Sequence, residues 1–301
     1  MSSLKDILLE RMPGLSVLEG EPMSRHTTFR IGGPAEYFAQ PASAEETALA
    51  IRTAQECGVP VLVVGNGSNL LVRDGGIPGL VVLLGERFSR IDVCGNTITA
   101  QAGATLARLA SAAQKAGLSG LEFASGIPGT VGGGTAMNAG AYGGELSQVL
   151  SQADVLEDGR ILTLSASEME MGYRSTRILK RGGIALQASF ALQPDDPEEI
   201  AARMRDLNGR RREKQPLEYP SAGSTFKRPE GYFAGALIEG AGLKGTRIGG
   251  AMVSEKHAGF LINTGNASAE DVLALIAHVQ KTVREKYGVD LEPEVRIVGV
   301  N

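Results

Sequence analysis

Glycine is the feature that most constrains this chain, because 40 of its 301 residues are glycine and many of them gather in short runs. The runs are "GNGSN" at residues 65–69, "SGIPGTVGGGTAMNAGAYGGE" at 125–145 and "GAGLKGTRIGGA" at 240–251. Glycine adopts positive φ easily and lets the main chain approach another group closely. Two interpretations are open from this feature alone: the runs form tight turns in a β-rich fold, or their main chain cradles a ligand.

Composition limits the class of protein. A chain of 301 residues with 43% hydrophobic and 21% charged residues is typical of a soluble globular protein of about two domains. The net charge of -4 argues against a nucleic-acid-binding protein, although a local cluster of cations can still hold a small anionic substrate. Cys57 and Cys94 lack metal-ligand or CxxC spacing, and neither a signal peptide nor a membrane-spanning run is visible, so we expect a cytoplasmic protein.

Residues 43–58 predict a helix. They begin with a capping box, Ser43 to Glu46, carry apolar residues at helical spacing and stop at Gly58. The sequence "VPVLVV" then predicts a buried strand that leads into the first glycine run. No G-x-G-x-x-G opens a helix after this strand, which disfavours a Rossmann fold.

Further along the chain, hairpins are predicted around Gly95-Asn96 and at the "EDGR" turn, each between segments with strand patterns. "ATLARLASAAQKAG" predicts a helix, and residues 194–216 predict a basic helix that connects to a second domain, its cations forming a solvated face. A capped amphipathic helix is expected from Ser268 to Gly288, followed by a short strand in "DLEPEVRIVGV".

Two of the glycine runs suit a dinucleotide. "GNGSN" offers successive main-chain amides with the Ser68 and Asn69 side chains, which suits a pyrophosphate, and "GIPGTVGGG" offers a second set. Each motif is weak alone, but together they suggest a dinucleotide held between two loops. The three histidines are isolated from one another in sequence, so no metal site is predicted.

Three polar residues leave their roles open when each is considered alone. Ser224 in "YPSAGSTFK" lacks the G-x-S-x-G pattern of a hydrolase nucleophile, and an ordinary turn hydroxyl is favoured over a phosphate ligand, a nucleophile or an acid. Arg174 in "GYRSTRI" reads as a surface or ion-pair residue, and Glu294 as a carboxylate just inside the terminal strand.

Seven segments in order resemble one enzyme family. They are "TTFRIGGPAEYFAQP", "VLVVGNGSNLLV", "LEFASGIPGTVGGGTAMNAGAYGGE", "GYRST", "AGSTFKRP", "GGAMVSEKHAGFLIN" and "LEPEVRIVG", and they extend from about residue 26 to the C-terminus. Together they closely resemble the UDP-N-acetylenolpyruvoylglucosamine reductases, which use FAD and NADPH to make UDP-N-acetylmuramate for bacterial peptidoglycan. Seven ordered segments are far more specific than any one of them.

The resemblance implies an α+β chain. It combines an FAD-binding PCMH-type flavin fold, like that of vanillyl-alcohol oxidase, with a smaller C-terminal α+β substrate domain. The implied ranges are 1–25 for an N-terminal extension, 26–195 for the FAD-binding domain with two subdomains split near residue 85, 196–290 for the substrate domain, and 291–301 for a strand that returns to the active site. The expected partners are a UDP-sugar and NADPH, without nucleic acid or membrane, and the chain is expected to be a monomer.

The resemblance also implies a two-step reaction. NADPH reduces a non-covalently bound FAD and leaves, and the enolpyruvyl substrate then takes a hydride on its terminal methylene carbon. Arg174 and Glu294 are implied to stabilise the charge that develops on the substrate carboxylate, since preorganised donors usually supply most of such stabilisation. Ser224 is implied as the acid that protonates the α-carbon, with Lys227 as a cation that helps it.

Contacts carry over from the matching segments. The implied FAD contacts are Gly65, Asn66, Gly67, Ser68, Asn69, Gly126, Ile127, Pro128, Gly129, Thr130, Gly132, Gly133, Asn138 and Ala139. Tyr173, Arg177 and Lys227 are implied contacts of the anionic substrate, and no metal ligand is implied. For the basic helix around Arg210 to Lys214, attraction of the diphosphate competes equally with a solvated face.

The sequence differs from the family pattern at one place, and two alternative functions stay open. The spacing between "GYRST" and "AGSTFKRP" is too short for the tyrosine-bearing loop that closes over the diphosphate in one type of the family, so this chain resembles the shorter type and its closing residues stay open. One rival is another FAD oxidoreductase of the same flavin fold, many of which bind flavin covalently through His or Cys; neither residue occurs in the two loops. The other rival is a nucleotide-sugar-binding protein without flavin.

Overall fold

Two compact units make up the chain, and each is assembled from separate stretches of sequence. The structure, a computed structural model, describes residues 3–301. The first unit contains the residues up to Leu18, Tyr37–Asn66 and Leu80–Arg211; the second contains Glu19–Glu36, Gly67–Gly79 and Arg212–Asn301. The division therefore falls inside three strands, β1 (Ser16–Pro22), β2 (Pro34–Gln40) and β5 (Ile77–Leu83), whereas the predicted domains are consecutive ranges.

The first unit begins with a pair of helices beside parallel strands. Ser43 caps the second helix by accepting a hydrogen bond from the N–H of Glu46, and Gly58 follows its end, which confirms the predicted helix. Apolar side chains such as Leu8, Ala50 and Val82 are buried together here. The elements are α1 (Leu4–Arg11), α2 (Ala44–Glu56) and β3 (Val61–Val64), which pairs in parallel with Leu80–Leu83 of β5 in a sheet of order β1-β2-β5-β3.

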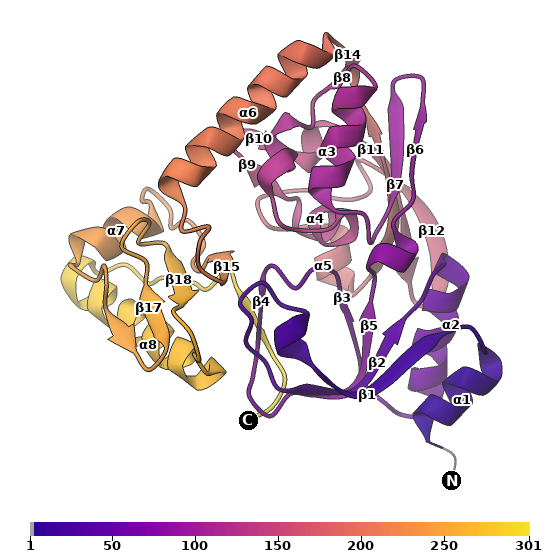
Figure 1. Cartoon of the computed structure of the whole chain (residues 1–301), viewed down its shortest axis with the longest axis horizontal. Helices are drawn as coiled ribbons and strands as arrows, with labels where there is room; N and C mark the ends of the chain where they lie inside the picture. Colours follow the sequence, from indigo (N-terminus) through magenta and orange to yellow (C-terminus); the bar gives the residue numbers. More distant parts are fainter. Residues whose placement is uncertain (1–2) are drawn as a thin grey trace. The chain divides into compact units, whose positions relative to one another are not determined.

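The first unit also contains a five-stranded antiparallel sheet of order β12-β11-β13-β7-β6 (Figure 1). Both predicted hairpins are confirmed: Asp158 and Gly159 have positive φ, as a type I′ turn requires, and Gly95 begins the other turn with positive φ. The elements are β6 (Ile91–Cys94), β7 (Thr97–Gln101), α3 (Leu106–Lys115), α4 (Val131–Met137), β11 (Leu150–Glu157), β12 (Arg160–Ser165), α5 (Arg177–Arg181), β13 (Ile184–Ala191) and α6 (Pro197–Lys214).

The second unit has a four-stranded antiparallel sheet of order β15-β18-β17-β16, against which the longest helix, α8, packs (Figure 1). A capping box between Ser268 and Asp271 begins α8, and Gly288 ends it in the left-handed region, as predicted. A separate parallel pair joins β4 to β19. The elements are β4 (Leu70–Val72), β15 (Ser221–Ser224), α7 (Ala234–Gly240), β16 (Arg247–Ile248), β17 (Ala251–Val253), β18 (Phe260–Asn263), α8 (Ala269–Tyr287) and β19 (Arg296–Val298).

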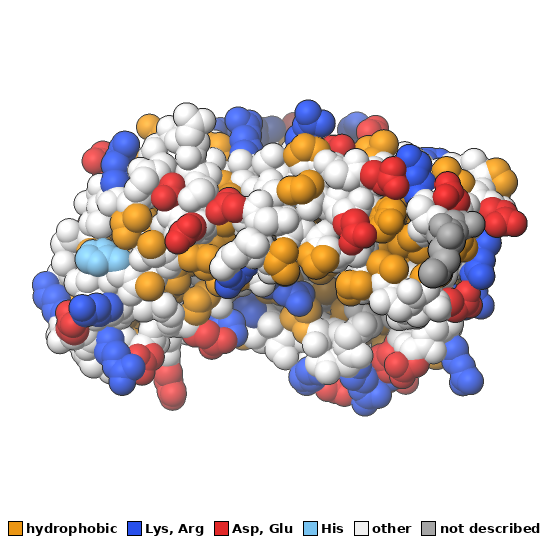
Figure 2. Space-filling model, turned by 90° about the horizontal axis from the view of Figure 1, so that it is seen from below, with side chains coloured by type: hydrophobic (Ala, Val, Ile, Leu, Met, Phe, Trp, Pro, Cys, Tyr) orange, Lys and Arg blue, Asp and Glu red, His pale blue; other side chains and the backbone are white. Residues whose placement is uncertain are grey.

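On the face drawn in Figure 2, Lys and Arg side chains are interspersed with Asp and Glu. Within residues 3–301, no helix is both long enough and apolar enough to cross a membrane. The short elements are η1 (Met23–Arg25), η2 (Glu86–Phe88), β8 (Leu118–Ser119), η3 (Glu122–Gly126), β9 (Gly140–Ala141), β10 (Gly144–Glu145), η4 (Leu146–Gln148) and β14 (Gln193–Pro194).

Candidate active site

The two predicted cofactor loops meet within the first unit. Asn66 Nδ2 donates to the carbonyl oxygen of Pro128 over 3.0 Å. A Cβ added to Gly65 would lie 2.3 Å from Thr130 Oγ1, so only glycine fits at residue 65. Segments that are more than sixty residues apart in sequence are therefore in contact, and this contact is compatible with the prediction that both loops hold one ligand.

The main chain of the first loop fits a phosphate-bearing group such as FAD. Among residues 3–301, no acceptor is found for the N–H groups of Asn66, Gly67, Ser68 or Asn69. Consecutive amides without protein acceptors suit an anionic ligand. Gly67 has a φ of 59°, and an added Cβ would lie 2.1 Å from the carbonyl oxygen of His26 in the second unit, so this position also requires glycine.

In the second glycine loop, unlike the first, main-chain N–H groups already donate to acceptors in the protein. The N–H groups of Val131 and Gly132 donate to the carbonyl oxygens of Ala104 and Ala102. A Cβ on Gly132 would lie 2.7 Å from Ala102 Cβ, so this glycine allows close packing between segments of the chain. Gly132 thus has a structural reason to be glycine that the sequence interpretation as a cofactor contact did not include.

Arg174 lies in a strained two-residue turn of the first unit. Gly172 and Ser175 exchange both main-chain hydrogen bonds, over 2.8 and 3.2 Å, which leaves Tyr173 and Arg174 at the tip. Arg174 has a φ of 51°, a left-handed conformation that costs an L-residue about 1–2 kcal/mol. Its guanidinium carbon lies 5.3 Å from the centroid of the exposed Tyr173 ring. Strain of this kind is concentrated at functional sites in proteins.

Asn138, predicted as a flavin contact, uses its side chain inside the protein. It is buried at the C-terminus of α4, where Nδ2 donates to the carbonyl oxygen of Gly172 over 3.1 Å and Oδ1 accepts from the N–H of Ser147 over 2.9 Å. The buried Thr176 hydroxyl donates to the carbonyl oxygen of Ala136 over 2.7 Å. Nothing in the sequence distinguishes Thr176 from an ordinary helix cap, because it is a threonine that precedes a helix.

Arg177, predicted as a substrate contact, forms a bidentate ion pair with Glu157. Nε and one Nη donate to the two carboxylate oxygens over 3.1 and 2.9 Å, and the Glu157 side chain is only 7% exposed. Hydrogen bonds from Arg177 hold the pKa of Glu157 below its ordinary value. Two donor sets of the guanidinium are therefore already engaged by the protein, which indicates a structural role for this arginine.

Ser224 and Glu294 lie on neighbouring segments of the second unit. The N–H of Glu294 donates to the carbonyl oxygen of Thr225 over 2.8 Å, and Phe226 bridges Pro293 in antiparallel fashion. Two expectations are corrected here. Ser224 ends strand β15 instead of lying in a turn, because it pairs with Phe260 after a bulge at Gly223, whose φ is 76°. Glu294 precedes β19 instead of lying inside it, because its N–H is paired with Thr225.

Asn69 ties the first glycine loop to the Glu294 segment within the second unit. Its Nδ2 donates to the carbonyl oxygen of Glu294 over 3.0 Å, and its own carbonyl oxygen accepts from the N–H of Arg296 over 2.9 Å. Lys227, the predicted helper of Ser224, forms an ion pair with Glu292. Asn69 was predicted as a cofactor contact, and in the structure its side chain is hydrogen-bonded to Glu294, a candidate catalytic residue.

The surroundings of the Ser224 hydroxyl include two residues that sequence reasoning did not place there. Ser224 Oγ donates to the carbonyl oxygen of Phe226 over 3.3 Å. A Cβ added to Gly259 would lie 3.5 Å from this oxygen and 3.0 Å from His257 Cε1. Burial lowers the pKa of His257, whose Nδ1 accepts from the N–H of Gly259 over 3.1 Å. The imidazole beside Ser224 therefore favours its neutral form.

The basic helix α6 divides into buried and exposed cations. Arg211 is buried, its guanidinium donates to the carbonyl oxygen of Gly126, and it lies 5.7 Å from the Tyr142 ring centroid. Burial lowers the pKa of Arg211. Arg210, in contrast, is exposed and pairs with Asp206 on the same helix over 2.7 Å. Neither of the two predicted roles of this helix, attraction of the diphosphate or a solvated face, describes Arg211. Its hydrogen bond to Gly126 instead stabilises the start of the second glycine loop.

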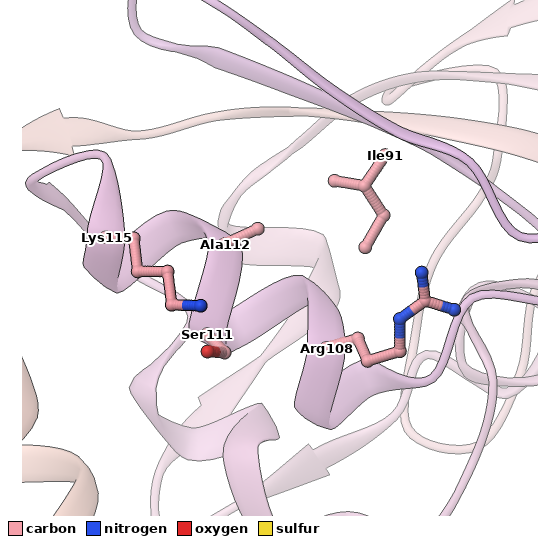
Figure 3. A pocket seen from close by; sticks show the side chains of 5 residues that line it. All are labelled: Ile91, Arg108, Ser111, Ala112 and Lys115. Carbon is pink, nitrogen blue, oxygen red and sulfur yellow. The ribbon is translucent and has the colours of Figure 1, made fainter.

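A pocket of about 300 Å³ lies elsewhere in the first unit, on α3 (Figure 3). None of the predicted site residues lines it. Within residues 3–301, no group of three His, Cys, Asp or Glu side chains gathers in a way that suits a metal ion. The lining residues are Ile91, Arg108, Ser111, Ala112 and Lys115.

Comparison with known proteins identifies the family. Residues 215–298 match the model of the UDP-N-acetylenolpyruvoylglucosamine reductase C-terminal domain, and residues 35–165 match an FAD-binding domain. UDP-N-acetylenolpyruvoylglucosamine reductases of Agathobacter rectalis and Clostridium novyi are each 54% identical to this chain; the first alignment covers 96% of both chains, and the second covers 92% of this chain and 90% of the relative.

Solved structures agree with this result. The reductase of the same name from Thermus caldophilus has a TM-score of 0.80 at 37% identity, covering 94% of this chain and 98% of its own. A BBE-like 1 protein from Physcomitrella patens, at 18% identity and a TM-score of 0.51 over 64% of this chain and 45% of its own, shows a likeness of fold alone. These matches confirm the predicted flavin fold and the FAD cofactor. The chain belongs to the UDP-N-acetylenolpyruvoylglucosamine reductase family of FAD-dependent oxidoreductases.

Proposed function

We propose that this chain reduces the enolpyruvyl group of UDP-N-acetyl-3-O-(1-carboxyvinyl)glucosamine to UDP-N-acetylmuramate for peptidoglycan precursor synthesis, with NADPH as the reductant. The observation that carries the proposal is the pairing of the segments that contain Ser224 and Glu294, with 2.8 Å between the Glu294 nitrogen and the Thr225 oxygen. The reaction needs a proton donor and a carboxyl group that act on adjacent atoms of one substrate. The name shared by the relatives supports the choice of substrate.

FAD, when bound, takes reducing equivalents from NADPH and passes them to the substrate. We propose that it is held by the amides of residues 66–69, for which residues 3–301 supply no acceptor, and by the loop around Pro128 and Thr130, which contacts the first loop directly. Gly126, Ile127, Gly129, Gly133 and Ala139 are proposed as further contacts through their main chain.

The side chains of three residues act on the substrate in this proposal. Arg174 offers a planar pair of N–H donors to the substrate carboxylate, an arrangement that suits a carboxylate bidentately. Glu294 shares a proton with the same carboxylate as negative charge develops there. The Ser224 hydroxyl turns from the carbonyl oxygen of Phe226 and gives its proton to the α-carbon, and the removal of that weak 3.3 Å bond costs little.

Tyr173 and Lys227 are proposed as contacts of the anionic part of the substrate. Tyr173 is 57% exposed and precedes Arg174. Lys227 lies three residues after Ser224, and in this proposal its ammonium group leaves the ion pair with Glu292 to bind the substrate. Arg177 is proposed as a structural residue instead, because Glu157 already engages it through two hydrogen bonds.

A stopped-flow experiment on the purified protein tests the function. Flavin bound to the protein should be bleached by NADPH, and anaerobic mixing with the enolpyruvyl substrate should restore its absorbance with formation of UDP-N-acetylmuramate, identified by mass. Acid denaturation should release the flavin, since no covalent bond is expected. Reduced flavin that reacts with oxygen but ignores the enolpyruvyl substrate would contradict the proposal, and bleaching by an alcohol or hydroxy acid would indicate an oxidase of the same fold.

A further inference from the structure

We propose that Asn138 and Thr176 are positioning residues for Arg174, because their side chains fix the main chain on both sides of the turn that carries its guanidinium. The inference rests on the proposed function in one respect only, namely that Arg174 binds the substrate carboxylate. The turn is defined by residues 172–175, and both anchors connect it to the C-terminal end of α4, within the first unit.

Asn138 fixes the side of the turn that begins at Gly172. The carbonyl oxygen of Gly172 receives two hydrogen bonds, from the N–H of Ser175 within the turn and from Asn138 Nδ2 outside it. The Asn138 amide has a single orientation that fits, because its Oδ1 accepts from the N–H of Ser147 at the same time. Asn138 is 1% exposed and adopts the left-handed conformation that asparagine tolerates, so the α4 terminus aims this amide at the turn.

Thr176 fixes the side of the turn that ends at Ser175. It precedes α5, a position where a threonine hydroxyl usually accepts a hydrogen bond from the first turn of its own helix. Here its side chain makes no capping bond, and the hydroxyl donates to the carbonyl oxygen of Ala136. The carbonyl groups in the last turn of a helix lack helical partners, and the Thr176 hydroxyl supplies such a partner to Ala136.

The conformation of Arg174 explains why the turn needs two anchors. A left-handed residue at the tip of a turn is usually glycine, and an arginine there is held against its own preference. A guanidinium that binds a carboxylate through two donors must be placed to within a fraction of an ångström. The turn sequence does not provide that placement by itself, whereas side-chain hydrogen bonds from a buried helix end do.

Proteolysis of the flavin-bound enzyme tests the anchoring directly. Asn138→Gly keeps the left-handed backbone and deletes the amide, and Thr176→Val deletes the hydroxyl with little change of shape. Trypsin should cut after Arg174 roughly 10-fold faster in each variant, because cleavage follows the population of locally opened turn. Thr176→Ser should behave as wild type. Thr135→Val is the matched control, since it removes from α4 a buried hydroxyl that has no partner among residues 3–301.

Transient kinetics then connect the anchors to Arg174. In both variants, flavin reduction by NADPH should keep its rate while reoxidation by the enolpyruvyl substrate slows roughly 10- to 100-fold, the loss expected for a misplaced catalytic group. In an Arg174→Ala background, the same substitutions should have no further effect. Equal losses with and without Arg174, or unchanged cleavage after Arg174 in variants that fold, would overturn the proposal. A wild-type enzyme that does not react with the substrate would overturn the proposed function, and the trypsin result would then decide the anchoring alone.

Discussion

The turn that carries Arg174 is held by side chains, whereas the segments that carry Ser224 and Glu294 are held mainly by main-chain hydrogen bonds. Asn138 and Thr176 supply the bonds in the first case. In the second case, Thr225 accepts from the N–H of Glu294 and donates its own N–H to Gly259, both over 2.8 Å. Main-chain bonds do not depend on residue identity, so the second arrangement tolerates substitution of its neighbours better than the first.

The two regions also differ in backbone strain. Arg174 itself occupies the left-handed region, while beside Ser224 the corresponding conformation is adopted by Gly223, at a φ of 76°. Glycine adopts it without steric cost, and the serine is left with an extended conformation at the end of β15. One candidate catalytic residue is therefore placed at the expense of stability and the other is not.

Ser224→Ala is expected to have the largest effect. Reoxidation of the reduced flavin by the enolpyruvyl substrate should slow by roughly 10²–10⁴-fold, the usual contribution of a general acid, while reduction by NADPH is unchanged. Rapid-mixing absorbance measures both steps. Ser221→Ala in the same strand is the control, because the structure uses the Ser221 carbonyl oxygen, bonded to Thr28, rather than its hydroxyl. Parallel loss of both half-reactions would remove Ser224 from its role as acid.

Arg174→Gly should separate function from stability. Reoxidation by the substrate should slow by about 10²-fold, since a preorganised donor to the developing charge is lost. The free energy of unfolding should rise by about 0.5–1 kcal/mol, because relief of the left-handed strain exceeds the entropy that glycine loses on folding. Urea denaturation and transient kinetics measure the two effects. Asp158→Gly, at the exposed hairpin turn, should leave the kinetics unchanged, and a fall in stability for Arg174→Gly would contradict the strain argument.

Asn69→Ala tests whether the position of the Glu294 segment depends less on side-chain hydrogen bonds than the position of the Arg174 turn does. The variant loses one hydrogen bond to the carbonyl oxygen of Glu294, while the main-chain bond from Glu294 to Thr225 stays. Reoxidation should slow by no more than about 5-fold, which corresponds to a single hydrogen bond of about 1 kcal/mol. A loss as large as that of Asn138→Gly would break the distinction between the two regions. Loss of flavin at normal stability would instead assign the Asn69 side chain to the cofactor.

His257→Gln should have the smallest effect, and it concerns pH. Burial lowers the folded-state pKa of His257 below the unfolded value of about 6.5, so the unfolded chain binds the proton more readily. Wild-type stability should therefore fall as the pH drops through about 6.5 towards the lower folded-state pKa. Glutamine keeps an acceptor for the N–H of Gly259 and does not titrate. Thermal melts between neutral and mildly acidic pH should show a flatter profile for the variant, and identical profiles would refute the assignment.

Local signals in the sequence predicted much of the secondary structure. Ser43, Ser268 and the Asp158-Gly159 pair each fix a cap or turn through atoms only a few residues apart. The position of Ser224 was not predictable in this way, because "SAGS" has turn composition and becomes a strand only by pairing with β18. The division into units was not predictable for the same reason, because pairing between distant segments, such as β4 with β19, brings separate stretches of sequence into one unit.

The candidate site was predictable as a set of segments but not as a set of contacts. Two glycine loops were expected to act together, and Asn66 and Gly65 do meet Pro128 and Thr130. The side-chain hydrogen-bond partners of Asn138 and Asn69 were not predictable, because an asparagine amide binds a carbonyl group of its own chain as well as it binds a flavin. Nothing in sequence spacing distinguishes these two partners.

The bond from Asn69 to Glu294 joins residues 225 positions apart, and it has a consequence for synthesis on the ribosome. β4, which begins one residue after Asn69, has β19 as its partner strand within the described residues, and β19 is formed by residues 296–298. Loop closure over such a distance is slow, and early segments wait for late ones. We therefore expect Gly67, Ser68 and Asn69 to take their final conformation only after translation has passed Val298, so that the flavin is acquired after synthesis and not during it.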